Sequence, residues 1–98
     1  MNITTVRDGS ELTVKVEGRL DAITSPQFEH TLDENIAGVD ELVIDLAATE
    51  YLSSAGLRAI LYVQKKMNEQ GSMKVLNVSP EVMEIFEVTG FAKILTFG

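Results

Sequence analysis

The feature that most constrains the fold is a short, almost wholly apolar run, Leu42-Val43-Ile44-Asp45-Leu46. Such a run is expected of a central strand whose two faces are both covered. Helical patterns precede and follow this run, so strand and helix patterns alternate along the chain. Because strands that alternate with helices are joined by parallel crossovers, the sequence predicts an α/β fold.

The N-terminal segment predicts an antiparallel hairpin. Residues 3–6 and 12–16 read as strands that flank Asp8-Gly9-Ser10, and Asp-Gly is a strong hairpin turn signal. In the second strand Leu12, Val14 and Val16 alternate with polar residues, which indicates one buried face. The hairpin makes the sheet mixed rather than purely parallel.

Three helices are predicted from apolar spacing and end signals. The first helix starts at Thr24-Ser25-Pro26-Gln27, with Thr24 as the N-cap and Gln27 completing a capping box, and it ends near Gly38. The second helix opens at Ser54-Ala55-Gly56 and ends at Gly71. The third helix starts at Ser79-Pro80-Glu81 and ends at Gly90. Further strands are expected at residues 73–78 and 94–97. The predicted order is β-β-α-β-α-β-α-β, a mixed, mainly parallel sheet flanked by helices, in one domain over residues 1–98.

The composition excludes several classes of site. The chain has no cysteine, so it has no disulfide, no thiolate metal site and no cysteine nucleophile. No apolar run approaches the roughly 18 residues of a membrane span, and no signal peptide pattern is present. The formal net charge of −7 disfavours nucleic acid and anionic lipid as partners. We expect a cytoplasmic protein without metal or cofactor.

An enzyme is not expected either. His30 is the only histidine and falls inside the first predicted helix, where a solvated position is expected. No G-x-S-x-G elbow surrounds Ser53 or Ser54, so neither has the setting of a hydrolase nucleophile. No G-x-x-x-x-G-K-[ST] phosphate loop is present.

Two serines, Ser53 and Ser54, come where the central strand leads through a loop into the second helix. The first amides of a helix have no internal partner and carry partial positive charge, so a hydroxyl there caps the helix and a phosphate is stabilised. Small residues at Ala55 and Gly56 would let another protein approach the backbone closely. By position alone, a plain helix cap is the better explanation of the serines, because Ser is a leading N-cap residue.

Three motifs in the right order resemble the STAS domains of anti-sigma factor antagonists. They are Gly18-Arg19-Leu20-Asp21, then Asp45-Leu46 with Tyr51-Leu52-Ser53-Ser54-Ala55-Gly56-Leu57, and finally Phe86-Glu87-Val88-Thr89-Gly90-Phe91. The resemblance spans essentially the whole chain. It departs from the family pattern where Ser53 replaces an aspartate and where Ala55 replaces Ser or Thr.

This resemblance implies a switch controlled by phosphorylation. Ser54 aligns with the phosphorylated serine, and Ser53 is the second candidate. The unphosphorylated form would bind an anti-sigma factor that is also a serine kinase, which releases a sigma factor; a serine phosphatase would reverse the modification. The implied partner-binding residues are Asp21, Ser53, Ser54, Ala55, Gly56 and Leu57. If Asp21 and Glu50 lie near Ser54, they would add like charge to a phosphate there.

Other interpretations remain open. STAS-like domains also serve as partner modules of transporters, lipid-transport complexes and stress-sensing assemblies, without a reversible phosphoserine. Asp21 is expected to cap a local turn or to belong to the binding face. Tyr51 and Leu52 are expected to anchor the loop in the core.

Overall fold

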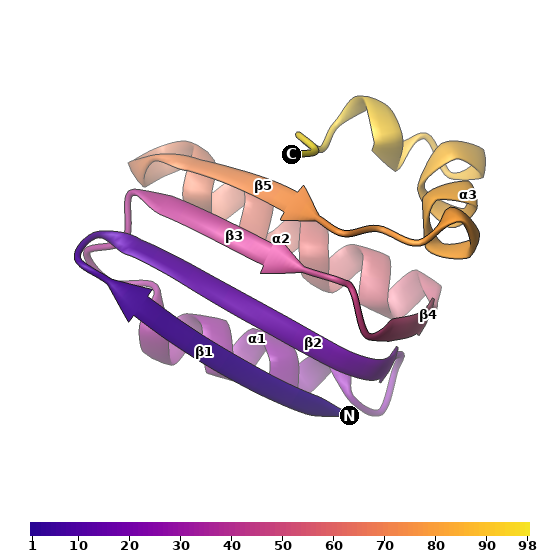
Figure 1. Ribbon diagram of the computed structural model, residues 1–98, viewed down its shortest axis with the longest axis horizontal. Helices are drawn as coiled ribbons and strands as arrows, with labels where there is room; N and C mark the ends of the chain where they lie inside the picture. The colour runs from indigo at the N-terminus through magenta and orange to yellow at the C-terminus, as the bar shows by residue number, and fades with distance from the viewer.

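A five-stranded sheet forms the centre of the computed structural model, which describes all residues from Met1 to Gly98 (Figure 1). The strands are β1 (Asn2–Asp8), β2 (Glu11–Leu20), β3 (Glu41–Asp45), β4 (Thr49–Leu52) and β5 (Ser72–Leu76). Their order is β1-β2-β3-β5, and β4 pairs with the far end of β2. Only β1 and β2 are antiparallel; the other pairs are parallel. The predicted hairpin and the mixed, mainly parallel sheet are confirmed.

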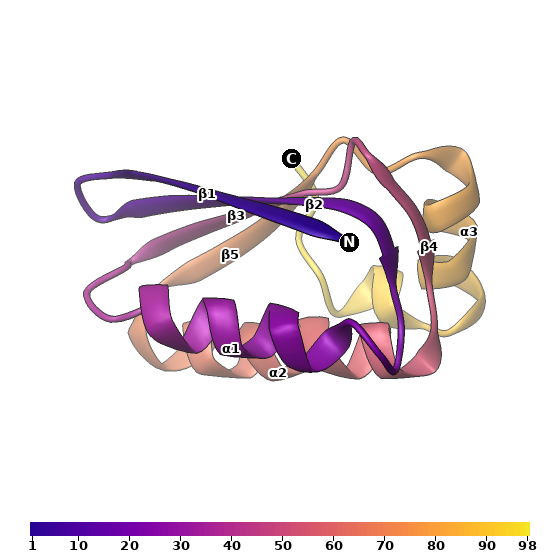
Figure 2. The ribbon, with the colours of Figure 1, turned by 90° about the horizontal axis from the view of Figure 1, so that it is seen from below.

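The helices lie on one face and at one end of the sheet. They are α1 (Ser25–Asn35), α2 (Ser54–Gln70) and α3 (Pro80–Val88), followed by a short 3-10 helix, η1 (Phe91–Lys93). Figure 2 shows α1 and α2 side by side beneath the sheet and α3 beyond β4. Phe28 of α1 and Phe86 of α3 are fully buried in the single apolar core that these elements enclose.

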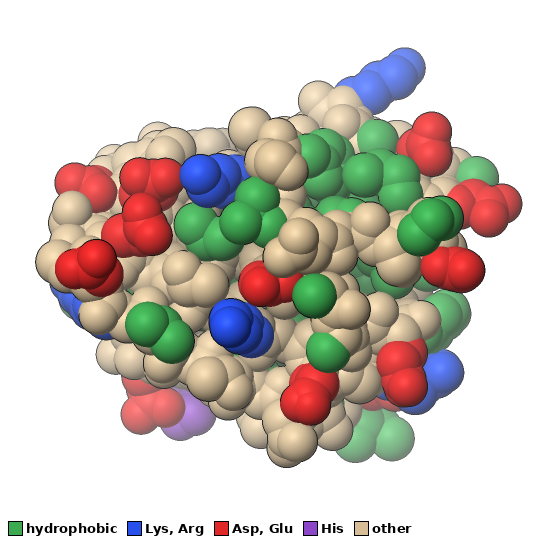
Figure 3. Space-filling model, in the orientation of Figure 1, with side chains coloured by type: hydrophobic (Ala, Val, Ile, Leu, Met, Phe, Trp, Pro, Cys, Tyr) green, Lys and Arg blue, Asp and Glu red, His purple; other side chains and the backbone are tan.

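The other face of the sheet carries no helix, yet β3 is buried on both faces as expected, because Leu42, Val43 and Ile44 alternate between the faces and are all at most 4% exposed. Val43 points to this open face yet is only 4% exposed, because Thr13 and Lys74 flank it on the neighbouring strands. Its apolar character reflects a central position in the sheet rather than a second helical layer. Acidic side chains gather at the left end of this face in Figure 3, where register pairs Glu11 with Asp8 and with Glu41.

A polar cluster joins α1 to α2 on the outside. Lys66 Nζ lies 2.7 Å from Asp33 Oδ1, and the Tyr62 hydroxyl donates to the same carboxylate at 3.2 Å. The hydrogen bond from Lys66 lowers the pKa of Asp33, and burial opposes it only in part. The same contact raises the pKa of Lys66 above its usual value. Each group therefore stabilises the charged form of the other.

Two elements differ from the sequence prediction. The chain at residues 49–52 forms β4, which was not predicted, because only Thr49 and Leu52 are buried and no alternation marks the segment. The expected strand at 94–97 is reduced to a single bridge between Val75 and Phe97, after η1. Leu52 is buried as predicted, but Tyr51 is 39% exposed, so its predicted core role was wrong.

Candidate functional site

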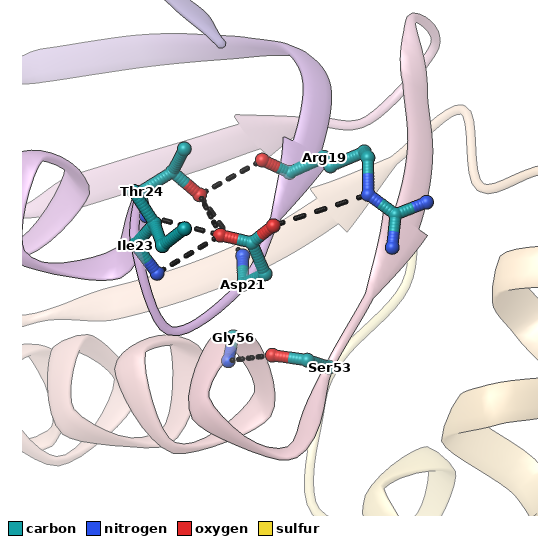
Figure 4. A network of polar contacts seen from close by, with 6 residues as sticks. All are labelled: Arg19, Asp21, Ile23, Thr24, Ser53 and Gly56. Carbon is teal, nitrogen blue, oxygen red and sulfur yellow. Dashed lines mark hydrogen bonds and ion pairs between the residues drawn. The ribbon is translucent and has the colours of Figure 1, made fainter.

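The turn between β2 and α1 is fastened by Asp21 (Figure 4). Its Oδ1 accepts hydrogen bonds from the backbone N–H groups of Ile23 at 3.0 Å and Thr24 at 3.1 Å. The Thr24 hydroxyl donates to the carbonyl of Arg19 at 2.8 Å and accepts from the Asp21 N–H at 2.9 Å. The predicted role of Asp21 as a turn cap is confirmed.

The same contacts overturn the predicted capping box. Thr24 precedes the first residue of α1, but it has helical backbone angles and its side chain makes no hydrogen bond to the helix. The turn engages both its hydroxyl and its N–H, and the N–H donates to Asp21 Oδ1, so Gln27 has no free N–H for the reciprocal bond. Helix α1 starts without a side-chain cap on its amides, and Pro26 lacks an N–H altogether.

Asp21 is an ionised carboxylate at the surface. The hydrogen bond from the Thr24 N–H is the main cause of its lowered pKa, with smaller contributions from Ile23 and Arg19. The Arg19 guanidinium lies 3.9 Å from Asp21 Oδ2 and also stacks over the ring of Tyr51, 4.5 Å from its centroid. The exposed ring of Tyr51 is therefore packed against Arg19 of β2.

The two serines at the start of α2 have different surroundings. Ser53 is the N-cap in extended conformation, and its Oγ accepts from the N–H of Gly56 at 3.3 Å (Figure 4). Its own N–H donates to the carbonyl of Leu20 at 3.0 Å. Ser54 is the first residue of the helix and is exposed, and its hydroxyl makes no hydrogen bond within the protein. Helix capping therefore occupies Ser53 and leaves Ser54 free.

Gly56 and Leu57 are buried and cannot present a surface to a partner. A Cβ at Gly56 would lie 2.3 Å from the carbonyl oxygen of Leu20, so the glycine is required by packing inside the protein. Leu57 is 6% exposed and belongs to the core. Of the residues expected to bind a partner, these two position the loop, while Asp21, Ser53, Ser54 and Ala55 reach the surface at least in part.

A groove of about 260 Å³ runs between the first turns of α1 and α2. It is lined by Ala22, Ser25, Pro26, Glu29, Ala55, Arg58 and Ala59. Arg58 is exposed and forms no ion pair, while Ser25 is 4% exposed and its Oγ has no hydrogen-bond partner. Sequence reasoning missed both residues, although the spacing of four between Ser54 and Arg58 was a usable signal.

Two further features bear on the kinds of site present. Glu50, considered as a neighbour of Ser54, lines a separate hollow with Met1 and Glu17. His30 is solvated, as expected, and its Nε2 lies 3.0 Å from Glu34. No group of three histidine, aspartate or glutamate side chains could hold a metal ion, and no helix has the length and apolar character needed to span a bilayer.

The class of domain follows from this architecture and from comparison with known families. The sequence profile of the STAS domain matches residues 2–98, and the chain belongs to the STAS domain family. Within it, the chain is 32% identical to BtrV of Bordetella bronchiseptica, a protein classed with the anti-sigma factor antagonists, over 96% of this chain and 83% of the relative. These antagonists are regulatory proteins rather than enzymes, and they control sigma factors by partner switching.

Solved structures agree with this assignment. The crystal structure of an anti-sigma factor antagonist from Mycobacterium paratuberculosis superposes with a TM-score of 0.88 at 26% identity, over 98% of this chain and 83% of the other. The phosphorylated form of SpoIIAA, a Bacillus cell fate determinant, superposes with a TM-score of 0.76 at 16% identity, over 99% and 91%. At this low identity, the similarity to SpoIIAA is one of fold alone.

Proposed function

We propose that this chain is an anti-sigma factor antagonist whose unphosphorylated form binds an anti-sigma factor serine kinase and thereby releases a sigma factor. Phosphorylation of Ser54 by that kinase ends the binding, and a serine phosphatase restores it. The observation that carries the choice of Ser54 is that its hydroxyl is exposed and unbonded, whereas the Ser53 hydroxyl caps α2. The proposal places this cycle in the cytoplasm, in a single domain over residues 1–98.

The location of Ser54 suits reversible modification. The first residue of α2 lies at the positive end of the helix dipole, where a phosphate is stabilised. The hydroxyl is solvent-exposed, so a kinase active site can reach it without unfolding the helix. SpoIIAA, which is similar to this chain in fold, has been solved in a phosphorylated form. This supports the idea that the fold tolerates phosphorylation.

Electrostatics supplies a reason for release. A phosphate adds a charge of about −1.5 to −2, and Asp21 on the neighbouring turn is already ionised. Like charges that are desolvated in an interface cost several kcal/mol, which is enough to abolish a moderate affinity. Refolding is not required, because the Ser54 side chain is exposed and its hydroxyl makes no hydrogen bond within the protein. A large structural change on phosphorylation would contradict this mechanism.

Binding and modification can be measured with four proteins: wild type, Ser54→Ala, Ser54→Asp and Ser53→Ala. Each is used to capture proteins from a lysate of the native cell, and the captured proteins are identified by mass spectrometry. We expect wild type and Ser54→Ala to retain an anti-sigma factor of the serine-kinase type and Ser54→Asp to lose it. With the kinase and ATP, phosphate should appear on wild type and on Ser53→Ala but not on Ser54→Ala.

Two results would overturn the proposal. Phosphate on Ser53 in the wild-type protein would move the switch by one residue. Equal capture of a transporter or scaffold protein by wild type and Ser54→Asp, without a kinase, would instead assign the chain to the partner modules that lack a phosphoserine.

A further inference from the structure

We propose that Arg58 binds the phosphate on Ser54 and holds it across the mouth of the groove between α1 and α2. This inference rests on the proposed function and adds to it a named residue that fixes where the phosphate lies. In the phosphorylated state the groove is then covered from within the molecule.

The spacing along α2 brings the two side chains together. Ser54 and Arg58 are four residues apart on one helix, so their Cβ atoms are neighbours at about 5–6 Å. Both residues are exposed, so their side chains are free to adopt the geometry of a contact. An arginine fork matches phosphate oxygens with two parallel hydrogen bonds, which a lysine cannot reproduce.

Arg58 is available for this contact because no other group engages it. No carboxylate lies within ion-pair distance of it, although the chain carries 15 acidic residues and eight basic ones. By contrast, Lys66 on the same helix is held by Asp33. Arg58 also lines the groove next to Ala55, which follows Ser54 directly. Arg58 is thus an unpaired cation on an acidic protein, one helical turn from Ser54. This is the arrangement expected of a residue whose anionic partner, the phosphate on Ser54, is present only in the phosphorylated state.

The groove itself has unmet polar capacity. Ser25 lines it, is 4% exposed, and has a hydroxyl oxygen without a hydrogen-bond partner. Most of the other lining residues are alanine or proline, which leaves room above them. Glu29 on the α1 side is the one carboxylate in the lining, and its charge favours a phosphate kept at the Arg58 side of the mouth.

The test uses the full chain with phosphoserine incorporated at position 54, and it needs no partner protein. The second pKa of the phosphate is followed by ³¹P NMR in wild type, Arg58→Gln, Arg58→Lys and Lys65→Gln. Lys65 is the matched control, because it is exposed, forms no ion pair and lies about 16 Å from Ser54 along α2. Lys65→Gln therefore removes the same charge from the same helix at a distance. Urea midpoints of the four proteins verify that each is folded.

We expect Arg58→Gln to raise the phosphate pKa by about three quarters of a pH unit, as for loss of one charge in contact with the phosphate, about 4 Å away in water. Lys65→Gln should change it by a small fraction of that, since its charge lies beyond the screening length. Arg58→Lys should fall between, and phosphorylation should shift the Arg58 Nε–Hε resonance of the wild-type protein. Equal pKa values in Arg58→Gln and Lys65→Gln, or an unmoved Arg58 resonance, would overturn the inference.

Failure here is distinguishable from failure of the proposed function. If phosphoserine at position 54 abolishes binding of the anti-sigma factor while Arg58→Gln leaves the phosphate pKa unchanged, the switch stands and Arg58 has no part in it. If the phosphate pKa responds to Arg58 but phosphoserine leaves binding intact, the contact stands and the switch fails.

Discussion

Replacing Gly56 by alanine tests whether the start of α2 is fixed by its contact with β2. A Cβ at this position would lie 2.3 Å from the Leu20 carbonyl oxygen and 3.1 Å from its carbon. The same carbonyl accepts the Ser53 N–H at 3.0 Å, so α2 cannot move away without lengthening that hydrogen bond. The clash involves backbone on both sides, and neither side can rotate out of the way.

The magnitude follows from three opposing contributions. Overpacking of this kind costs about 1–3 kcal/mol, and a weakened hydrogen bond between Ser53 and Leu20 costs about 1 kcal/mol. Alanine in place of glycine in a helix returns up to about 1 kcal/mol. We therefore expect Gly56→Ala to lower the free energy of unfolding by about 2 kcal/mol. With a urea m-value of about 1.5 kcal/mol/M, the midpoint falls by about 1.3 M.

Urea unfolding followed by far-ultraviolet circular dichroism measures this change, and Ala55→Gly is the matched control. Ala55 lies in the same first turn, so Ala55→Gly reports the helix propensity difference with no clash and should cost up to about 1 kcal/mol. If propensity alone governed the site, Gly56→Ala would be stabilising by a similar amount. A neutral or stabilising Gly56→Ala would refute the steric reasoning.

Three further outcomes are expected. Ser53→Ala should lower the free energy of unfolding by about 1 kcal/mol through loss of the cap, while Ser54→Ala should change it by less than about 0.5 kcal/mol; equal effects in urea would contradict the assignment of the cap. Phe86→Ala should cost about 3–5 kcal/mol by emptying a fully buried site, and a loss below about 1 kcal/mol in the same assay would show that α3 packs loosely. Because the pKa of Asp33 is lowered in the folded state, its contribution is present above the unfolded value near 3.8 and is lost as pH falls through the folded value. Asp33→Asn should therefore flatten the loss of stability below about pH 4, as urea midpoints at several pH values would show, and an unchanged pH profile would mean that the contact with Lys66 is not formed in solution.

Much of the fold could be predicted from local sequence patterns. The Asp8-Gly9 turn, the alternation in β2 and the apolar run of β3 predicted three strands that the structure contains. The caps at Ser79 and Gly71 also marked helix ends correctly. These features were readable because each depends on residues close together in the chain.

Features set by distant parts of the chain could not be read in this way. Strand β4 exists because it pairs with β2 across the irregularity between Gly18 and Arg19, and its own four residues show no period. The exposed place of Tyr51 likewise depends on Arg19, which stacks over its ring. Thr24 was predicted to cap the helix because its sequence context is that of an N-cap. In the structure its hydroxyl instead forms hydrogen bonds with the backbone of Arg19 and Asp21 in the preceding turn.

At the candidate site the division is equally physical. The sequence by itself determined that two serines precede a helix and that their motif is that of the STAS family, because motif and spacing are local properties. Only the tertiary structure decided that Ser53 is engaged as the cap while Ser54 stays free, and that Gly56 is pressed against Leu20. It also placed Arg58 and Ser25, from two helices, in one groove. Burial and neighbours across elements depend on how the helices pack on the sheet, and no local pattern records that packing.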